Sequence, residues 1–185
     1  PDYAATATGV DRTAGVPATS AVATATFPAL ERATLANGLK VIFVPRTGVP
    51  TVSMSLIVDA GSATDEATRA GLAALTPSVM TSGTRDLDAL QLSDRLQLLG
   101  ATLGAGSSVE STVVSMTAIA SRLEPSLALF ADVIEHPAFR PEDFGRSQAQ
   151  QISGIQQADR SPGAIANRVL AMNVYGPDSP YGRQS

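Results

Sequence analysis

The segment at residues 51–59 reads TVSMSLIVD. Its apolar residues Val52, Met54, Leu56 and Val58 occupy every second position. Because successive side chains of a β-strand point to opposite faces, this alternation predicts a strand with one buried face. The segment therefore indicates a sheet that packs on one side against an apolar layer.

Further strands are predicted on both sides of this segment. Residues 33–45 read ATLANGLKVIFVP and place two short apolar runs around Asn37-Gly38. This dipeptide is typical of a hairpin with a type I′ turn, in which both central residues need a positive φ. Residues 101–110 and 111–120, ATLGAGSSVE and STVVSMTAIA, are rich in β-branched and small residues and predict two more strands.

Helical patterns separate and follow the strands. The predicted helices cover residues 71–80 with an interruption at Pro77, 88–99 with a stop at Gly100, 125–135, 141–157, and a last one that carries Ile165, Val169 and Met172 and ends before Gly176. The apolar stripe expected in the third of these helices is Leu127, Phe130, Ala131 and Ile134. Strands followed by helices, without regular βαβ alternation, predict an α+β fold in which helices pack on one side of a largely antiparallel sheet.

The length of 185 residues suits one domain of ordinary size. Residues 1–28 are rich in Ala, Thr, Gly and Pro and lack a hydrophobic period, so we expect a flexible linker or arm there. Residues 29–185 are expected to form most of one domain. The chain begins at Pro1 without Met or a visible secretory signal, and is expected to be a piece of a longer protein.

Composition excludes several classes of function. The net charge of -4 argues against nucleic-acid binding, which depends on clustered Lys and Arg. The absence of Cys excludes disulfides, thiolate zinc ligands and thiol nucleophiles. No apolar run approaches the roughly 20 residues that span a bilayer. The basic residues are twelve Arg and the single Lys40, which indicates a GC-rich bacterial source.

Residue chemistry by itself indicates no reaction centre. The single histidine, His136, lies at the end of the predicted helix 125–135, where it can favour the helix dipole. No serine lies in a G-x-S-x-G motif that could pair with it. Asp86 and Asp88 are the nearest approach to a calcium loop, but they more simply cap the helix that follows.

Three segments resemble the amino-terminal core of the pitrilysin/insulinase family of zinc metallopeptidases. They are ERATLANGLKVIFVP, VSMSLIVDAGSATD and AGLAALTPSVMTSGT, and the similarity continues through LEPSLALFADVIEHPAFRPEDF to NVYGPDSPYGRQS. It covers about residues 29–185. Active members of the family carry an inverted zinc motif, H-x-x-E-H, between the glycines that here are Gly71 and Gly83.

The chain departs from the family at the zinc site. In an ungapped alignment the first histidine ligand falls on Ala74, the glutamate base on Pro77 and the second histidine on Ser78. The third ligand, a glutamate at the family's usual spacing, falls on Gly154. We therefore expect no catalytic residue, no metal ligand and no cofactor in this chain. The carboxylates Asp65, Glu66 and Glu110 and the distant His136 are not expected to replace them.

The resemblance implies a clamshell of homologous domains in which one half carries zinc and the other helps to hold the peptide. The chain is thus expected to be an inactive domain that forms chamber wall and substrate contacts, with Gln148, Gln150 and Gln151 as candidate lining. Its catalytic half can belong to the same polypeptide or to a separate subunit. The alternatives are a structural or assembly subunit without a proteolytic role and an enzyme with an unrecognised site. A periplasmic location is weakly favoured by analogy, and a missing last strand is expected to expose a sheet edge through which copies associate.

Overall fold

The computed structural model describes residues 28–46 and 48–183. The chain forms two compact units, Pro1–Thr47 and Gly48–Ser185, which we describe separately. Apart from its last residue, the predicted arm at residues 1–28 lies outside the described residues.

The first unit contains the predicted hairpin. Strand β1 (Glu31–Thr34) pairs antiparallel with β2 (Lys40–Phe43). Gly38 has a φ of 86°, and its N–H donates to the Leu35 carbonyl at 2.9 Å. The type I′ prediction is wrong, because Asn37 does not have a positive φ. Instead its side-chain Oδ1 accepts a hydrogen bond from the Leu39 N–H at 3.1 Å, so that only the glycine needs the left-handed conformation.

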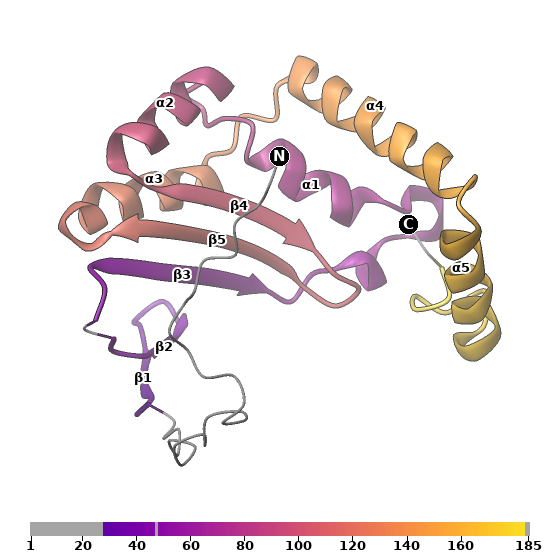
Figure 1. Cartoon of the computed structure of the whole chain (residues 1–185), viewed down its shortest axis with the longest axis horizontal. Helices are drawn as coiled ribbons and strands as arrows, with labels where there is room; N and C mark the ends of the chain where they lie inside the picture. The colour runs from indigo at the N-terminus through magenta and orange to yellow at the C-terminus, as the bar shows by residue number, and fades with distance from the viewer. Residues whose placement is uncertain (1–27, 47, 184–185) are drawn as a thin grey trace, which may run out of the picture. The chain divides into compact units, whose positions relative to one another are not determined.

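The second unit is built on a sheet of three antiparallel strands in the order β3-β5-β4 (Figure 1). The strands are β3 (Thr51–Val58), β4 (Thr102–Ser107) and β5 (Thr112–Ile119). Met116 of the central strand is paired with Met54 of β3 and with Leu103 of β4. The alternation predicted for residues 51–59 is confirmed from Val52 to Leu56, where the even-numbered residues are the less exposed ones. Val58, which was expected on the same buried face, is exposed.

Five α-helices complete this unit. They are α1 (Leu72–Met80), α2 (Ala89–Leu99), α3 (Leu123–Glu135), α4 (Pro141–Ala158) and α5 (Pro162–Tyr175), with 3₁₀ turns η2 (Ser62–Thr64), η3 (Ala67–Arg69) and η4 (Ala120–Arg122). The predicted interruption at Pro77 is wrong, since α1 continues through it to Met80. Helix α2 begins with a capping box, in which Asp88 and Gln91 exchange hydrogen bonds, and ends at Gly100. Among the helices within residues 28–46 and 48–183, none combines the length and the apolar character that a membrane span requires.

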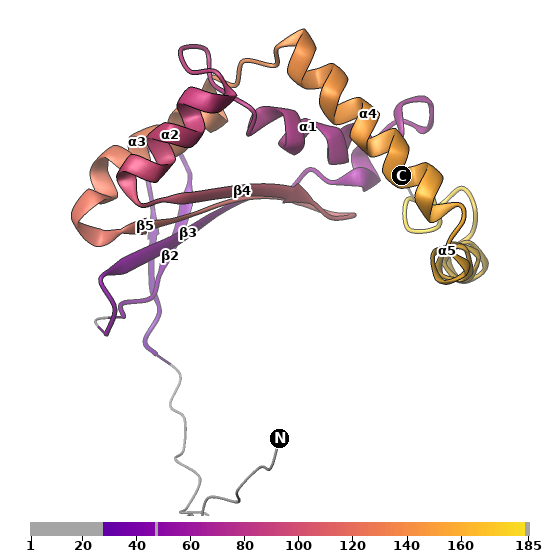
Figure 2. The ribbon, with the colours of Figure 1, turned by 45° about the horizontal axis from the view of Figure 1, so that its top comes forward.

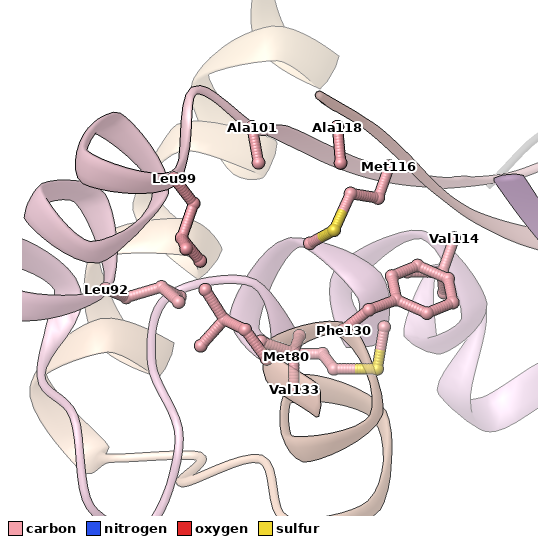
Figure 3. Close-up of a cluster of buried hydrophobic side chains, with 10 residues drawn as sticks. Met80, Leu92, Leu99, Ala101, Val114, Met116, Ala118, Phe130 and Val133 are labelled. Atoms are coloured by element: carbon pink, nitrogen blue, oxygen red, sulfur yellow. The ribbon is translucent and has the colours of Figure 1, made fainter. Parts of the chain in front are cut away.

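Helices α1, α2 and α3 lie on one face of the three-stranded sheet (Figure 2). The core between the layers contains Met80, Leu92, Leu99, Ala101, Val114, Met116, Ala118, Leu129, Phe130 and Val133 (Figure 3). The face that α3 buries differs in part from the predicted stripe. Phe130 is buried, and Ala131 and Ile134 are partly buried, as predicted. Leu127 is half exposed, however, and the other buried residues are Ser126, Leu129 and Val133. The α+β class, with helices on one side of an antiparallel sheet, is confirmed.

Candidate functional site

The predicted zinc-site positions lie on α1 and α4, which pack side by side. The first turn of α1 is capped by Asp65, whose carboxylate accepts the N–H groups of Gly71 and Ala73, each at 3.0 Å. Gly71 has a φ of 95°, and its carbonyl accepts a hydrogen bond from the Gln151 side chain of α4 at 3.1 Å. A Cβ at Gly71 would come within 2.8 Å of that Gln151 nitrogen, so glycine permits the close approach.

A second contact joins the two helices farther along α1. The Ser78 hydroxyl lies 3.4 Å from the Ser147 hydroxyl of α4. Ser147, Gln151 and Gly154 follow each other at i, i+4 and i+7, which places them on one face of α4. We call this contact region, formed by Gly71 and Ser78 on α1 with Ser147 and Gln151 on α4, the α1–α4 seam.

The four positions aligned with zinc-site residues divide between the two helices. Ala74 and Ser78 are exposed and lie one turn apart on α1, whereas Pro77 is buried. Gly154 is exposed on the seam face of α4, and a Cβ built on it meets nothing within 4 Å. The structure thus places Ser78 in contact with α4. Gly154 lies three residues after Gln151 on the face of α4 that forms the seam.

The groups that meet across the seam are uncharged, while the Asp65 carboxylate binds the Gly71 N–H on the α1 side. The side chains of the seam are two hydroxyls and a carboxamide, and its backbone partner is a carbonyl. Within residues 28–46 and 48–183, no three His, Asp or Glu side chains gather in a way that could hold a metal ion. These groups can bind by hydrogen bonds, but they offer neither a general base nor a nucleophile that is activated near neutral pH.

The other residues considered as ligands lie apart from the seam or have other roles. His136 ends α3, where its Nδ1 lies 3.3 Å from the Asp132 carboxylate. Glu110 accepts a hydrogen bond from the Tyr181 hydroxyl at 2.6 Å, and this bond together with the Glu110 charge raises the pKa of Tyr181. Glu66 is exposed at the start of η3. Sequence reasoning missed the link between Glu110 and Tyr181.

Among the glutamines predicted to line a chamber, only Gln151 belongs to the seam. Gln148 and Gln150 are exposed on α4. The same helix begins with a buried Asp143 that forms an ion pair with Arg146. The helical spacing from Ser147 to Gly154 was the signal in the sequence that could have indicated the seam face.

Within residues 48–183, β4 is an edge strand of the sheet with no partner on its outer side, and it lies beside α1. The Ser108 N–H donates to the Ser111 carbonyl at 2.7 Å. This bond determines which residues of β4 form backbone hydrogen bonds to β5. In an antiparallel pair, alternate residues direct both backbone groups to the partner strand. The even-numbered residues of β4 therefore bond to β5, and Leu103, Ala105 and Ser107 direct their N–H and C=O groups to the open side.

Comparisons with known proteins give matches both in sequence and in fold. The sequence model of the family described as "Insulinase (Peptidase family M16)" matches residues 40–179. An uncharacterised zinc protease of Rickettsia bellii is 24% identical over 149 residues. The beta subunit of the mitochondrial-processing peptidase of Rattus norvegicus is 25% identical over 153 residues. A crystal structure of an inactive peptidase M16 domain from Pseudomonas fluorescens superposes with a TM-score of 0.80 at 30% identity.

The chain corresponds to part of each of these proteins. The matches cover 80%, 77% and 84% of this chain, but only 36% of the Rickettsia protein, 31% of the rat subunit and 38% of the Pseudomonas chain. The chain thus spans about a third of the length of the relatives that it matches.

Proposed function

Since the chain belongs to the insulinase family, peptidase family M16, we propose that it is a member that holds no catalytic zinc and binds peptide within a larger proteolytic assembly. The observation that carries this proposal is that the side chains meeting across the α1–α4 seam are uncharged, since the family resemblance aligns positions of these two helices with the zinc site. The likeness to an inactive domain from Pseudomonas fluorescens supports it.

The zinc-free part of the proposal follows from ligand chemistry. Zinc in proteins is bound by imidazole, thiolate or carboxylate groups, and a catalytic site needs three of them. Ala74, Ser78 and Gly154 supply none, so no metal-bound water is brought to a pKa near 7. Pro77 likewise supplies no carboxylate to act as a base. The chain is thus proposed to hydrolyse no peptide by itself.

The peptide-binding part rests on the open edge of β4. The outward N–H and C=O groups of Leu103, Ala105 and Ser107 can pair with an extended peptide, as an added strand does in other sheets. Because β4 packs next to α1, a peptide bound along this edge would lie beside the seam. In this arrangement the chain contributes one wall and part of the grip on a substrate that is cut elsewhere.

The cutting is assigned to a catalytic half that carries an intact H-x-x-E-H motif. Such a half can be supplied by the same polypeptide or by a separate subunit. The relatives support a larger assembly, because this chain spans about a third of their length and one of them is a subunit by name. Zinc is expected only in that catalytic half.

Metal content tests the zinc-free part. The purified chain is incubated with excess zinc chloride, dialysed, and analysed by inductively coupled plasma mass spectrometry. We expect far less than one zinc per chain. Near-stoichiometric zinc that survives dialysis would overturn this part of the proposal.

Amide hydrogen exchange tests the peptide-binding part. The probe is an extended peptide of alternating valine and threonine with lysines at both ends. Binding is expected to slow exchange at Leu103, Ala105 and Ser107, while the even-numbered amides of β4, already bonded to β5, change little. A peptide N-methylated on its edge-facing residues serves as the control and should not protect.

The same exchange experiment separates the alternative functions. If the unmethylated peptide protects no amide of β4, the peptide-holding role is contradicted and a structural or assembly subunit is favoured. If the methylated peptide protects equally well, strand addition is contradicted, because that mode of binding needs the peptide's own N–H groups.

A further inference from the structure

Helices α2 and α3 line an open groove of about 580 Å³. Each helix contributes one stripe at i, i+3, i+4 and i+7, starting at Gln91 on α2 and at Pro125 on α3. These helices are distinct from α1 and α4, which form the seam (Figure 1). The groove is therefore a second surface, which the proposed function does not use.

The groove has an apolar floor and an exposed apolar rim. Leu129 of α3 is 7% exposed and forms part of the floor, and Pro125 lies on the same stripe. Leu98 of α2 also lines the groove but is 77% exposed. A large aliphatic side chain at the mouth of a groove is a ready anchor for an apolar residue of a partner.

The charges around the groove are mainly negative. Asp86, Asp94 and Asp132 line it, against the single guanidinium of Arg95. Asp132 faces His136 within its own helix, whereas Asp86 and Asp94 take part in none of the ion pairs formed within residues 28–46 and 48–183. Two carboxylates are thus available to a cationic ligand beside an apolar surface.

We propose that the groove binds an amphipathic helical segment of a partner protein, with an apolar residue against Leu98 and Leu129 and Lys or Arg beside Asp86 and Asp94. A groove lined by one stripe from each of two helices suits a third helix, because side-chain ridges of one helix fit between those of its neighbours. The charge selects the partner. A second copy of this chain, with a net charge of -4, is disfavoured, whereas a basic segment is attracted.

Fluorescence anisotropy with a designed peptide tests this proposal. The probe is a lactam-bridged helix of about 14 residues, since shorter or unbridged helices are marginal in water. It carries a leucine stripe flanked by Lys and Arg, and the control peptide has Glu at the basic positions. We expect the basic peptide to bind the chain, binding to weaken as salt is raised, and the acidic peptide not to bind.

Matched variants locate the binding. Leu98→Ser is expected to weaken binding about ten-fold, whereas Leu90→Ser should leave it unchanged. Leu90 is 71% exposed on the same helix but does not line the groove, so it is a direct control. Asp86→Asn with Asp94→Asn is expected to weaken binding about five-fold. Asp178→Asn, in the turn after α5, should have no effect.

Several results would overturn the proposal. One is equal binding of the acidic and basic peptides, and another is an equal effect of the Leu90 and Leu98 variants. Absence of binding at millimolar peptide contradicts it directly. Sedimentation that shows a dimer abolished by Leu98→Ser would assign the groove to self-association instead, and would likewise exclude the basic partner.

Discussion

Tyr181 and Glu110 make a contact between residues 71 positions apart, and it can be detected by titration. The hydrogen bond and the negative charge of Glu110 raise the pKa of Tyr181 above the ordinary value of 10.0. We expect the absorbance difference at 295 nm between the chain and its Tyr181→Phe variant to titrate above pH 10. Glu110→Gln should bring that midpoint down, because it removes the charge.

The effect on stability has a defined sign. A tyrosine whose pKa is higher in the folded than in the unfolded state contributes stability below the unfolded value of about 10, and loses it as pH rises through the folded value. Glu66→Gln, which changes an exposed carboxylate that does not contact Tyr181, is the control. An unchanged midpoint in Glu110→Gln would contradict the assignment.

At single residues, local chemistry was predictable from the sequence and long-range contact was not. Asp88 was expected to cap a helix and does so, because its partner Gln91 is three residues away. The hairpin turn at Asn37-Gly38 was predicted correctly, but the positive φ predicted for Asn37 was wrong, since more than one turn type accepts Asn-Gly. Tyr181 could not be matched to Glu110, because nothing local specifies a partner 71 residues away.

Restoring zinc ligands on α1 and α4 tests whether the two helices keep the family's register. The triple variant Ala74→His, Ser78→His and Gly154→Glu supplies two imidazoles one turn apart and a carboxylate on the seam face. We expect it to bind one zinc ion per chain, because a side chain at Gly154 has open space around it. Competition with a chromogenic chelator measures the affinity.

The double variant that lacks Gly154→Glu is the matched control. It should bind zinc at least about ten-fold more weakly, since it has only two of the three protein ligands. Equal affinities would show that position 154 does not reach the ion, and that α4 is out of register with α1.

Among the elements, existence and order were predictable, and the buried face of α3 was not. Leu127, Leu129, Phe130 and Val133 place apolar side chains on more than one side of this helix. The hydrophobic period alone therefore did not determine which face of α3 points to the core. Packing against β5 determines this face. Pro77 was expected to interrupt α1, but the loss of one backbone hydrogen bond within a packed helix did not end it.

For the whole molecule, the core residues of the second unit indicate that this unit folds without the first. All ten members of the buried cluster lie between Met80 and Val133. We expect a chain of residues 48–185 to keep its helical circular dichroism and to unfold in one cooperative thermal transition. The 185-residue chain is the reference. A broad, non-cooperative transition of the shorter chain would contradict its independence.

The sequence was sufficient for the α+β class, because strand and helix patterns follow one another clearly along the chain. It was not sufficient for the strand order. The central strand β5 pairs with β3, from which it is separated by two 3₁₀ turns, two helices and strand β4, and no local signal specifies such a pairing. The family resemblance supplied the candidate site, since the residues at the seam have no reactive chemistry of their own.

The two contacts of the α1–α4 seam have a consequence for the environments that this helix pair tolerates. Hydroxyl, carboxamide and carbonyl groups neither gain nor lose protons between mild acid and mild alkali. They also attract no counter-ions. The cohesion that these two contacts provide is therefore indifferent to acidification and to metal-sequestering agents, either of which would loosen two helices that were cross-linked through a coordinated cation.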